Sequence, residues 1–251
     1  MTRIAANVSM LFTELPFLDR FEAARAAGFA GVECLFPYDH DPQEIRAALD
    51  ASGLPLILFN TPPGDWQAGE RGHAAVPGAE ARFEAGLRQA LEYAAILKPL
   101  HIHVMSGNAH GVEAHRTLDA NLKRALDLAP DQSFLIEPLN AQDMPGYYLS
   151  EFGLAAAAIA ETGSRIGLQF DLFHAARMGH DPVHVWNDVG RMTRHVQFAA
   201  APDRSEPDPA LLRAFIAKAK ANGYDGWFSA EYRPRAATEE GLTWLSAVQA
   251  P

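Results

Sequence analysis

Residues 166–171 read Ile-Gly-Leu-Gln-Phe-Asp, a short apolar run that ends in a carboxylate and is followed by Leu-Phe-His174. Similar short apolar runs recur along the whole chain, each separated from the next by a longer amphipathic segment. Short runs rich in β-branched and aromatic side chains are typical of buried parallel strands. We therefore expect strands at Ile4–Val8, Gly31–Leu35, Leu54–Phe59, Leu100–Met105, Ser133–Ile136, Ile166–Phe170, His195–Phe198 and Gly226–Ala230.

The amphipathic segments between these runs predict helices, and several begin beside a proline or end at a glycine. They are Leu15–Ala27, Pro42–Ser52, Gly78–Leu97, Val112–Leu128, Glu151–Thr162, Pro182–Arg191, Pro209–Asn222 and Thr238–Val248. Alternation of this kind indicates an α/β protein with a parallel sheet and helices outside it. Eight strand-helix units in 251 residues favour a single (β/α)8 TIM barrel that fills residues 1–251 as one domain.

An open, doubly wound sheet is the alternative fold. That fold usually carries a glycine-rich phosphate loop after its first strand, whereas Ser9-Met-Leu-Phe12 stands there in this chain. The long connection Asn60–Pro77 is rich in glycine and proline, which is typical of a lid or binding loop.

Composition narrows the class of partner. The formal net charge is -10, and the lysines and arginines are scattered, so we expect no nucleic-acid partner. No run approaches ~18 apolar residues, which argues against a membrane partner. Cys34 is the only cysteine, so no intramolecular disulfide can form, and with no evident secretory signal we expect a cytoplasmic protein. Whether the chain forms a homo-oligomer stays open.

A polar side chain closes each of the last four expected strands. These side chains are Glu137, Asp171, Gln197 and Glu231. Because the carboxyl ends of barrel strands form the rim where active sites are built, we expect the four to converge. An oxygen-only set suits Mg²⁺ or Mn²⁺, which would also relieve repulsion among three carboxylates. The alternative for any single acid is a helix N-cap or a surface ion pair, but four successive strands ending this way favour a metal site.

Eight segments spread over nearly the whole chain share motifs with one known family. They are Asn7–Leu18, Val32–Tyr38, Leu58–Gly72, His103–Gly107, Ile136–Asn140, Asp143–Leu149, Gln169–His174 and Glu231–Pro234. Through these segments the chain resembles the hydroxypyruvate isomerase family, a branch of the xylose isomerase-like barrels. The resemblance implies an isomerase that interconverts hydroxypyruvate and tartronate semialdehyde through an enediolate, or a relative that acts on 2-oxo-tetronates. It places the acid/base pair on Glu137 and Glu231, and the metal ligands on these two with Asp171 and Gln197.

Five further residues are candidates for binding a small hydroxy-carbonyl acid. His174 and His103 could hydrogen-bond its oxygens, and Arg204 could hold its carboxylate. Trp66 and Arg71 lie in the long loop, where they could exclude water and reach an anion. Structural packing is the alternative role for each of the five.

The segment after the seventh expected strand departs from the family pattern. It reads Ala-Ala-Ala-Pro-Asp-Arg204-Ser205-Glu-Pro, with Ser205 where relatives carry histidine, and it lacks their glycine-rich turn. A shifted substrate preference therefore stays open, as does another isomerase or epimerase of the same barrel group. A metal-dependent nuclease would need more metal ligands and a basic face, and the sequence shows neither. A barrel that binds a metal or ligand but has lost catalysis is the remaining alternative.

Overall fold

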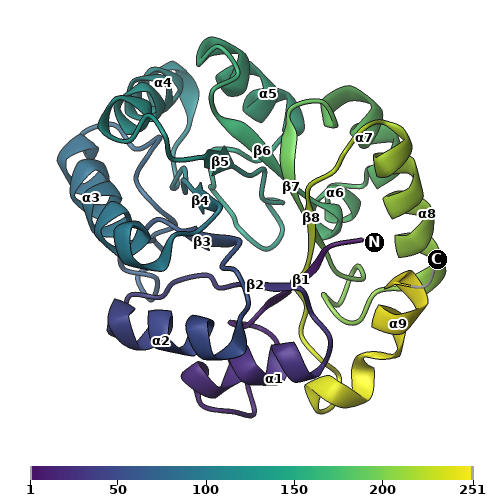
Figure 1. Cartoon of the computed structure of the whole chain (residues 1–251). Helices are drawn as coiled ribbons and strands as arrows, with labels where there is room; N and C mark the ends of the chain where they lie inside the picture. Colours follow the sequence, from purple (N-terminus) through teal and green to yellow (C-terminus); the bar gives the residue numbers. More distant parts are fainter. Residues whose placement is uncertain (1, 250–251) are drawn as a thin grey trace.

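The computed structural model describes residues 2–249, which form a barrel of eight parallel strands inside a ring of helices (Figure 1). The strands are β1 (Ile4–Asn7), β2 (Gly31–Glu33), β3 (Leu58–Asn60), β4 (His101–His103), β5 (Phe134–Ile136), β6 (Gly167–Asp171), β7 (Thr193–Phe198) and β8 (Trp227–Ala230). Each overlaps one of the apolar runs in the sequence, so the predicted TIM barrel is confirmed.

The helices follow the strands in turn. They are η1 (Phe17–Asp19), α1 (Arg20–Ala26), α2 (Pro42–Ser52), α3 (Glu80–Leu97), α4 (Gly111–Leu128), α5 (Phe152–Glu161), α6 (Leu172–Arg177), α7 (Pro182–Val189), α8 (Pro209–Ala221), η2 (Thr238–Gly241) and α9 (Thr243–Gln249). None of these described helices has the length and apolar character that a membrane crossing requires. Helix α6 was not predicted, because it begins directly after β6 and is too short to show a helical period.

Hydrogen bonds connect the strands in the order β2-β1-β8-β7-β6-β5-β4-β3. The remaining seam, between β2 and the chain leading into β3, is closed by backbone hydrogen bonds. The Ile57 amide donates to the Val32 carbonyl at 2.7 Å, and the Cys34 amide donates to the Leu58 carbonyl at 3.1 Å. Closure removes the free edges that an open sheet would expose, and it turns all eight carboxyl ends toward one rim.

An Asp-Pro pair starts three of the outer helices. Asp41, Asp181 and Asp208 each accept a hydrogen bond from a backbone amide of the first turn, and proline follows each one. A side-chain cap satisfies an amide that the helix leaves unpaired, and proline at the first position lacks one such amide. These local signals explain why the predicted starts of the helices agree with the structure at these positions.

Aromatic side chains fill the space between the barrel and the outer helices. Phe170 of β6 stacks on Phe215 of α8, with ring centroids 5.8 Å apart, and Trp186 of α7 packs edge-on against both rings. Burial of each such ring stabilises the fold by roughly 1.5–3 kcal/mol. This packing fixes β6 against α7 and α8, and β6 carries polar groups to the rim.

Candidate active site

The four side chains predicted as metal ligands lie at the carboxyl ends of neighbouring strands, as expected. Glu137 follows β5, Asp171 ends β6, Gln197 lies in β7 and Glu231 follows β8. All are buried, with between 0% and 4% of each residue exposed. Glu137 and Glu231 line a cavity of about 130 Å³, together with His103, His174 and Trp66. This volume lies far below the range of drug-sized pockets, so the cavity suits a ligand of few atoms.

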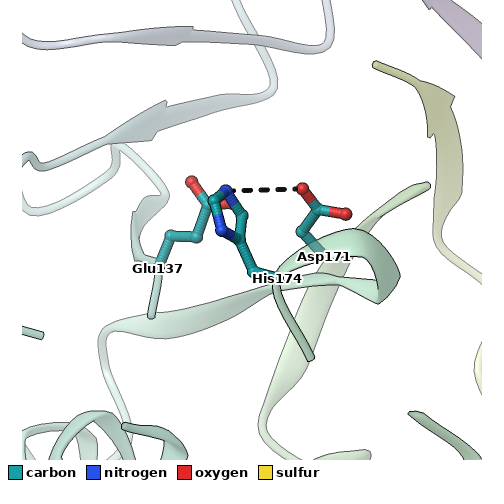
Figure 2. A group of neighbouring side chains, drawn as sticks. All are labelled: Glu137, Asp171 and His174. Atoms are coloured by element: carbon teal, nitrogen blue, oxygen red, sulfur yellow. Dashed lines mark ion pairs between the residues drawn. The ribbon is translucent and has the colours of Figure 1, made fainter. Parts of the chain in front are cut away.

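Glu137, Asp171 and His174 form one compact group at this rim (Figure 2). Each offers an oxygen or nitrogen atom, and these atoms lie within 4.8 Å of one another. Asp171 also caps helix α6, because its Oδ1 accepts a hydrogen bond from the Phe173 amide at 2.8 Å. The cap uses Oδ1 alone and Oδ2 faces the site, so the N-cap and ligand roles considered for this acid are compatible. By spacing alone, this cluster could hold a metal ion.

Gln169 lies two residues before Asp171 in β6, so both side chains point to the same face of the strand. It links two members of the predicted ligand set. Its Nε2 donates to Glu137 Oε2 at 2.8 Å and to Gln197 Oε1 at 2.6 Å. The other carboxylate oxygen, Glu137 Oε1, is buried and has no hydrogen-bond partner within the described part of the chain. A buried carboxylate oxygen without a partner is costly, and a cation beside it would remove that cost.

Arg204 supplies positive charge at the same rim. Its Nη2 donates to Glu231 Oε2 at 2.6 Å and lies 3.4 Å from Asp171 Oδ2. Its guanidinium also packs over the ring of Phe173, 4.8 Å from the centroid. Arg204 lines the cavity, but these contacts show it paired with two acids of the site. Its predicted role toward a substrate carboxylate stays a prediction.

Burial raises the pKa of every acid in the set. The pKa of Glu231 rises to about 8 and that of Asp171 to about 6, although the Arg204 guanidinium opposes both shifts. The pKa of Glu137 is raised well above its ordinary value, first by burial and then by repulsion from Glu231 and Asp171. Carboxylates that resist ionisation in this way can hold a proton near neutral pH, as a general acid must. A divalent cation would favour their ionised forms.

The two histidines of the cavity have opposite hydrogen-bonding roles. His174 Nδ1 accepts from the Asn140 backbone amide at 3.1 Å, so the proton of the neutral ring lies on Nε2, which faces Asp171 Oδ2 at 3.7 Å. His103 Nδ1 contacts Asn60 Oδ1 at 3.1 Å, which leaves Nε2 as an acceptor without a partner among residues 2–249. Burial holds the pKa of His103 at about 3 and that of His174 well below its ordinary value, so both rings stay neutral.

The long loop after β3 brings Trp66 over the cavity. Trp66 lines the cavity, contacts Phe36 with ring centroids 5.6 Å apart, and is 37% exposed. Arg71 stacks on it, with its guanidinium carbon 3.6 Å from the ring centroid, and donates to the backbone carbonyls of Trp66 and Glu70. Arg71 does not line the cavity itself, so its visible contacts are those that support Trp66.

Sequence reasoning missed several residues that the structure brings to the site. Asn7 of β1, Glu33 of β2 and Gln169 of β6 are buried polar side chains that bond to the predicted ligands. Arg233 lines the mouth of the cavity and makes no ion pair within the described residues. The available signal was a polar residue at an inward position of a strand, but inward and outward positions cannot be distinguished before the register is known.

Comparison with known proteins places this site in a family. The family model described as "Xylose isomerase-like TIM barrel" matches residues 21–248. The 2-oxo-tetronate isomerase of Cupriavidus necator is 45% identical, and the hydroxypyruvate isomerase of Escherichia coli is 37% identical; each match covers 98% of both chains. A crystal structure from Brucella melitensis, described as an AP endonuclease of family 2, superposes with a TM-score of 0.92 at 41% identity and 98% coverage of both chains.

These matches extend over nearly the whole chain and include every strand that contributes to the site. The chain therefore belongs to the xylose isomerase-like TIM-barrel family and, within it, to the group that contains these hydroxypyruvate and 2-oxo-tetronate isomerases.

Proposed function

We propose that this protein is a metal-dependent isomerase that interconverts hydroxypyruvate and tartronate semialdehyde through an enediolate. The observation that carries the proposal is the pair Glu137 and Glu231, two buried carboxyl groups with raised pKa values that line one small cavity. Full-length similarity to named isomerases supports an isomerase that acts on a sugar acid. Two placed carboxyl groups are what a proton transfer between adjacent carbons requires.

The proposed metal ligands are Glu137, Asp171, Gln197 and Glu231. The partnerless oxygen of Glu137 and the crowding of three buried acids fit a cation, and the oxygen-rich donor set favours Mg²⁺ or Mn²⁺. His174 is a poor ligand in its present tautomer, because its Nε2 carries the proton. When bound, such an ion would stabilise negative charge on the substrate's hydroxyl and carbonyl oxygens.

The reaction needs one proton removed from C3 of hydroxypyruvate and one delivered to C2. We assign the two transfers to Glu137 and Glu231, one acting as base and the other as acid, and either can act first. A second proton passes from the C3 hydroxyl to the C2 oxygen, so the atoms balance without an oxidant or reductant. Each transfer by a placed carboxyl group contributes ~10²–10⁴-fold.

The cavity wall offers a matching set of polar groups for the substrate. His174 Nε2–H can donate to the carbonyl oxygen, and His103 Nε2 can accept from the hydroxyl group. Arg204 and Arg233 supply positive charge for the carboxylate. Trp66, with Arg71 stacked on its ring, would cover the cavity and keep water from the enediolate.

A four-carbon 2-oxo-tetronate is the second candidate substrate. The relative from Cupriavidus necator carries that name at 45% identity, above the 37% of the Escherichia coli hydroxypyruvate isomerase. The segment after β7 also lacks the histidine and the glycine-rich turn expected there, and Arg204 and Ser205 lie in it. A change on this side of the rim would alter the space beside the substrate without touching the ligand set.

A direct assay tests the proposal and separates the two substrates. The protein is stripped with EDTA, reloaded with Mg²⁺ or Mn²⁺, and incubated with hydroxypyruvate and with a 2-oxo-tetronate at matched concentrations. We expect isomerisation that requires the metal, with the larger kcat/KM on hydroxypyruvate. A larger value on the 2-oxo-tetronate would favour the second candidate, and no metal-dependent turnover of either acid would contradict the proposed function.

A further inference from the structure

A buried glutamate lies beneath the proposed metal site without facing its cavity. Glu33, at the end of β2, is fully buried and accepts hydrogen bonds from three side chains of two other strands. Asn7 Nδ2 donates to its Oε1 at 3.0 Å and Gln197 Nε2 at 2.6 Å, while His195 Nε2 lies 2.7 Å from its Oε2. A carboxylate taken this far from water needs such partners. Its location inside the barrel therefore calls for a role beyond filling space.

The contact with Gln197 determines which end of that amide faces the site. An amide side chain has nearly the same shape with its oxygen and nitrogen exchanged, so only hydrogen bonds fix its orientation. Gln197 donates from its Nε2 to Glu33 Oε1 at 2.6 Å, so the amide turns its nitrogen toward Glu33 and its Oε1 away. That Oε1 is the atom a hard cation requires, and it lies 2.6 Å from Gln169 Nε2, which also contacts Glu137.

A second set of hydrogen bonds connects Glu33 to Glu231 through Asn7. Asn7 Nδ2 donates to Glu231 Oε1 at 3.1 Å as well as to Glu33. The amide of Asn7 cannot reverse freely, because its Oδ1 accepts a hydrogen bond from the Ser9 backbone amide at 3.0 Å. Glu33 is thus connected to two proposed ligands, directly to Gln197 and through Asn7 to Glu231.

We propose that Glu33 is a positioning residue for the metal site, which fixes the amide oxygen of Gln197 toward the ion and steadies Glu231 through Asn7. The proposal rests on the proposed function, since it assumes that Gln197 and Glu231 ligate a divalent ion. Groups that orient metal ligands typically change metal affinity by about 10–100-fold when they are removed.

Mn²⁺ titration by calorimetry tests this role without any turnover measurement. Glu33→Ala is expected to weaken Mn²⁺ binding by about 10–100-fold. Glu33→Gln is expected to bind nearly as the wild type does, because its oxygen can still accept from Asn7 and Gln197. Its amide nitrogen would then face His195, whose other ring nitrogen Nδ1 has no partner within residues 2–249 and can take the proton.

A double-mutant cycle and a control variant separate positioning from general damage. In a Gln197→Ala background, Glu33→Ala should cause a much smaller further loss of Mn²⁺ affinity, because the group that it orients is absent. Asn121→Ala removes a buried hydrogen bond of α4 to the Ala74 carbonyl, so it should lower the melting temperature and leave Mn²⁺ affinity unchanged.

Two results would overturn the assignment of Glu33. One is wild-type Mn²⁺ affinity in Glu33→Ala, and the other is an equal loss with and without Gln197. Failure of the wild type to bind Mn²⁺ would be a different outcome, since it would remove the metal site itself and this proposal with it.

Discussion

The guanidinium of Arg204 lies 2.6 Å from the carboxylate of Glu231, inside a rim that also holds Asp171 and Glu137. The arginine is partly buried, with 16% of its side chain exposed, and it opposes the burial-driven rise in the pKa of Glu231. One cation from the chain therefore partly balances three acids. The repulsion that remains among the acids helps to raise their pKa values, and a second, exchangeable cation would relieve it.

Replacing Arg204 should shift the pH dependence of the reaction. In Arg204→Met the pKa of Glu231 should rise further, because the charge that lowers it is gone. A hydrogen bond to a charged group is worth about 1.5–3 kcal/mol, so kcat/KM at pH 7 should fall roughly tenfold or more. The check is a pH–rate profile with saturating Mn²⁺, in which the limb set by Glu231 should move to higher pH: the acidic limb if Glu231 is the base, and the basic limb if it is the acid. A uniform loss at every pH would indicate a role in binding alone.

Substitution of either glutamate should remove activity without unfolding the protein. Glu137→Gln and Glu231→Gln keep the shape of the side chain and remove the proton transfer, so kcat should fall by ~10²–10⁴-fold. Glu113→Gln, on the exposed face of α4, is the matched control and should retain full activity. Circular dichroism would verify that all three variants fold. Turnover near the wild-type rate in either site variant would remove that glutamate from the mechanism.

The folded protein should lose stability in acid, because it buries two histidines. The pKa values of His101 and His103 are both held at about 3 by burial, so the unfolded chain binds more protons than the folded chain below about pH 6.5. The free energy of unfolding should therefore fall as the pH is lowered from about 6.5 toward 3. Urea unfolding at several pH values measures this slope, and His101→Gln should make it shallower. An unchanged slope in that variant would show that His101 is not neutral in the fold.

Arg71 should stabilise the loop that places Trp66 over the cavity. Arg71→Ala removes a stacking contact worth roughly 0.5–1 kcal/mol and two hydrogen bonds to loop carbonyls. We expect faster amide hydrogen exchange over residues 64–72 and a higher KM, with little change in global stability. Arg116→Ala, an exposed change on α4, is the control. Equal exchange rates in Arg71→Ala and the wild type would argue against a supporting role.

Much of the fold could be predicted because its signals are local. Proline after Asp41, and glycine at position 53 with a φ of 68°, mark both ends of α2, whose predicted bounds agree with the structure. Strand bounds were less accurate: the run Leu54–Phe59 overlaps β3 at two residues, but that strand covers Leu58–Asn60. The apolar pattern reports burial, whereas a strand also requires hydrogen-bonded neighbours, and these are distant in sequence.

Part of the candidate site could also be predicted because its signals are local in the sequence. Acids that close apolar runs stand out in the sequence, so Glu137 and Glu231 could be placed at the rim. Glu33 and Gln169 could not, because their importance comes from contacts across the barrel, such as Glu33 with His195, 162 residues apart. The pairing of Arg204 with Glu231 depends on the path of the loop after β7, which no local pattern determines.

Proton exchange followed by NMR tests the central claim most directly. The metal-loaded protein is incubated with hydroxypyruvate in D₂O, and the signal of the C3 protons is recorded with time. We predict enzyme-dependent uptake of deuterium at C3, which EDTA abolishes and excess Mn²⁺ restores. Retention of both C3 protons by a protein that binds Mn²⁺, with the 2-oxo-tetronate equally unexchanged, would contradict enediolate chemistry at this site.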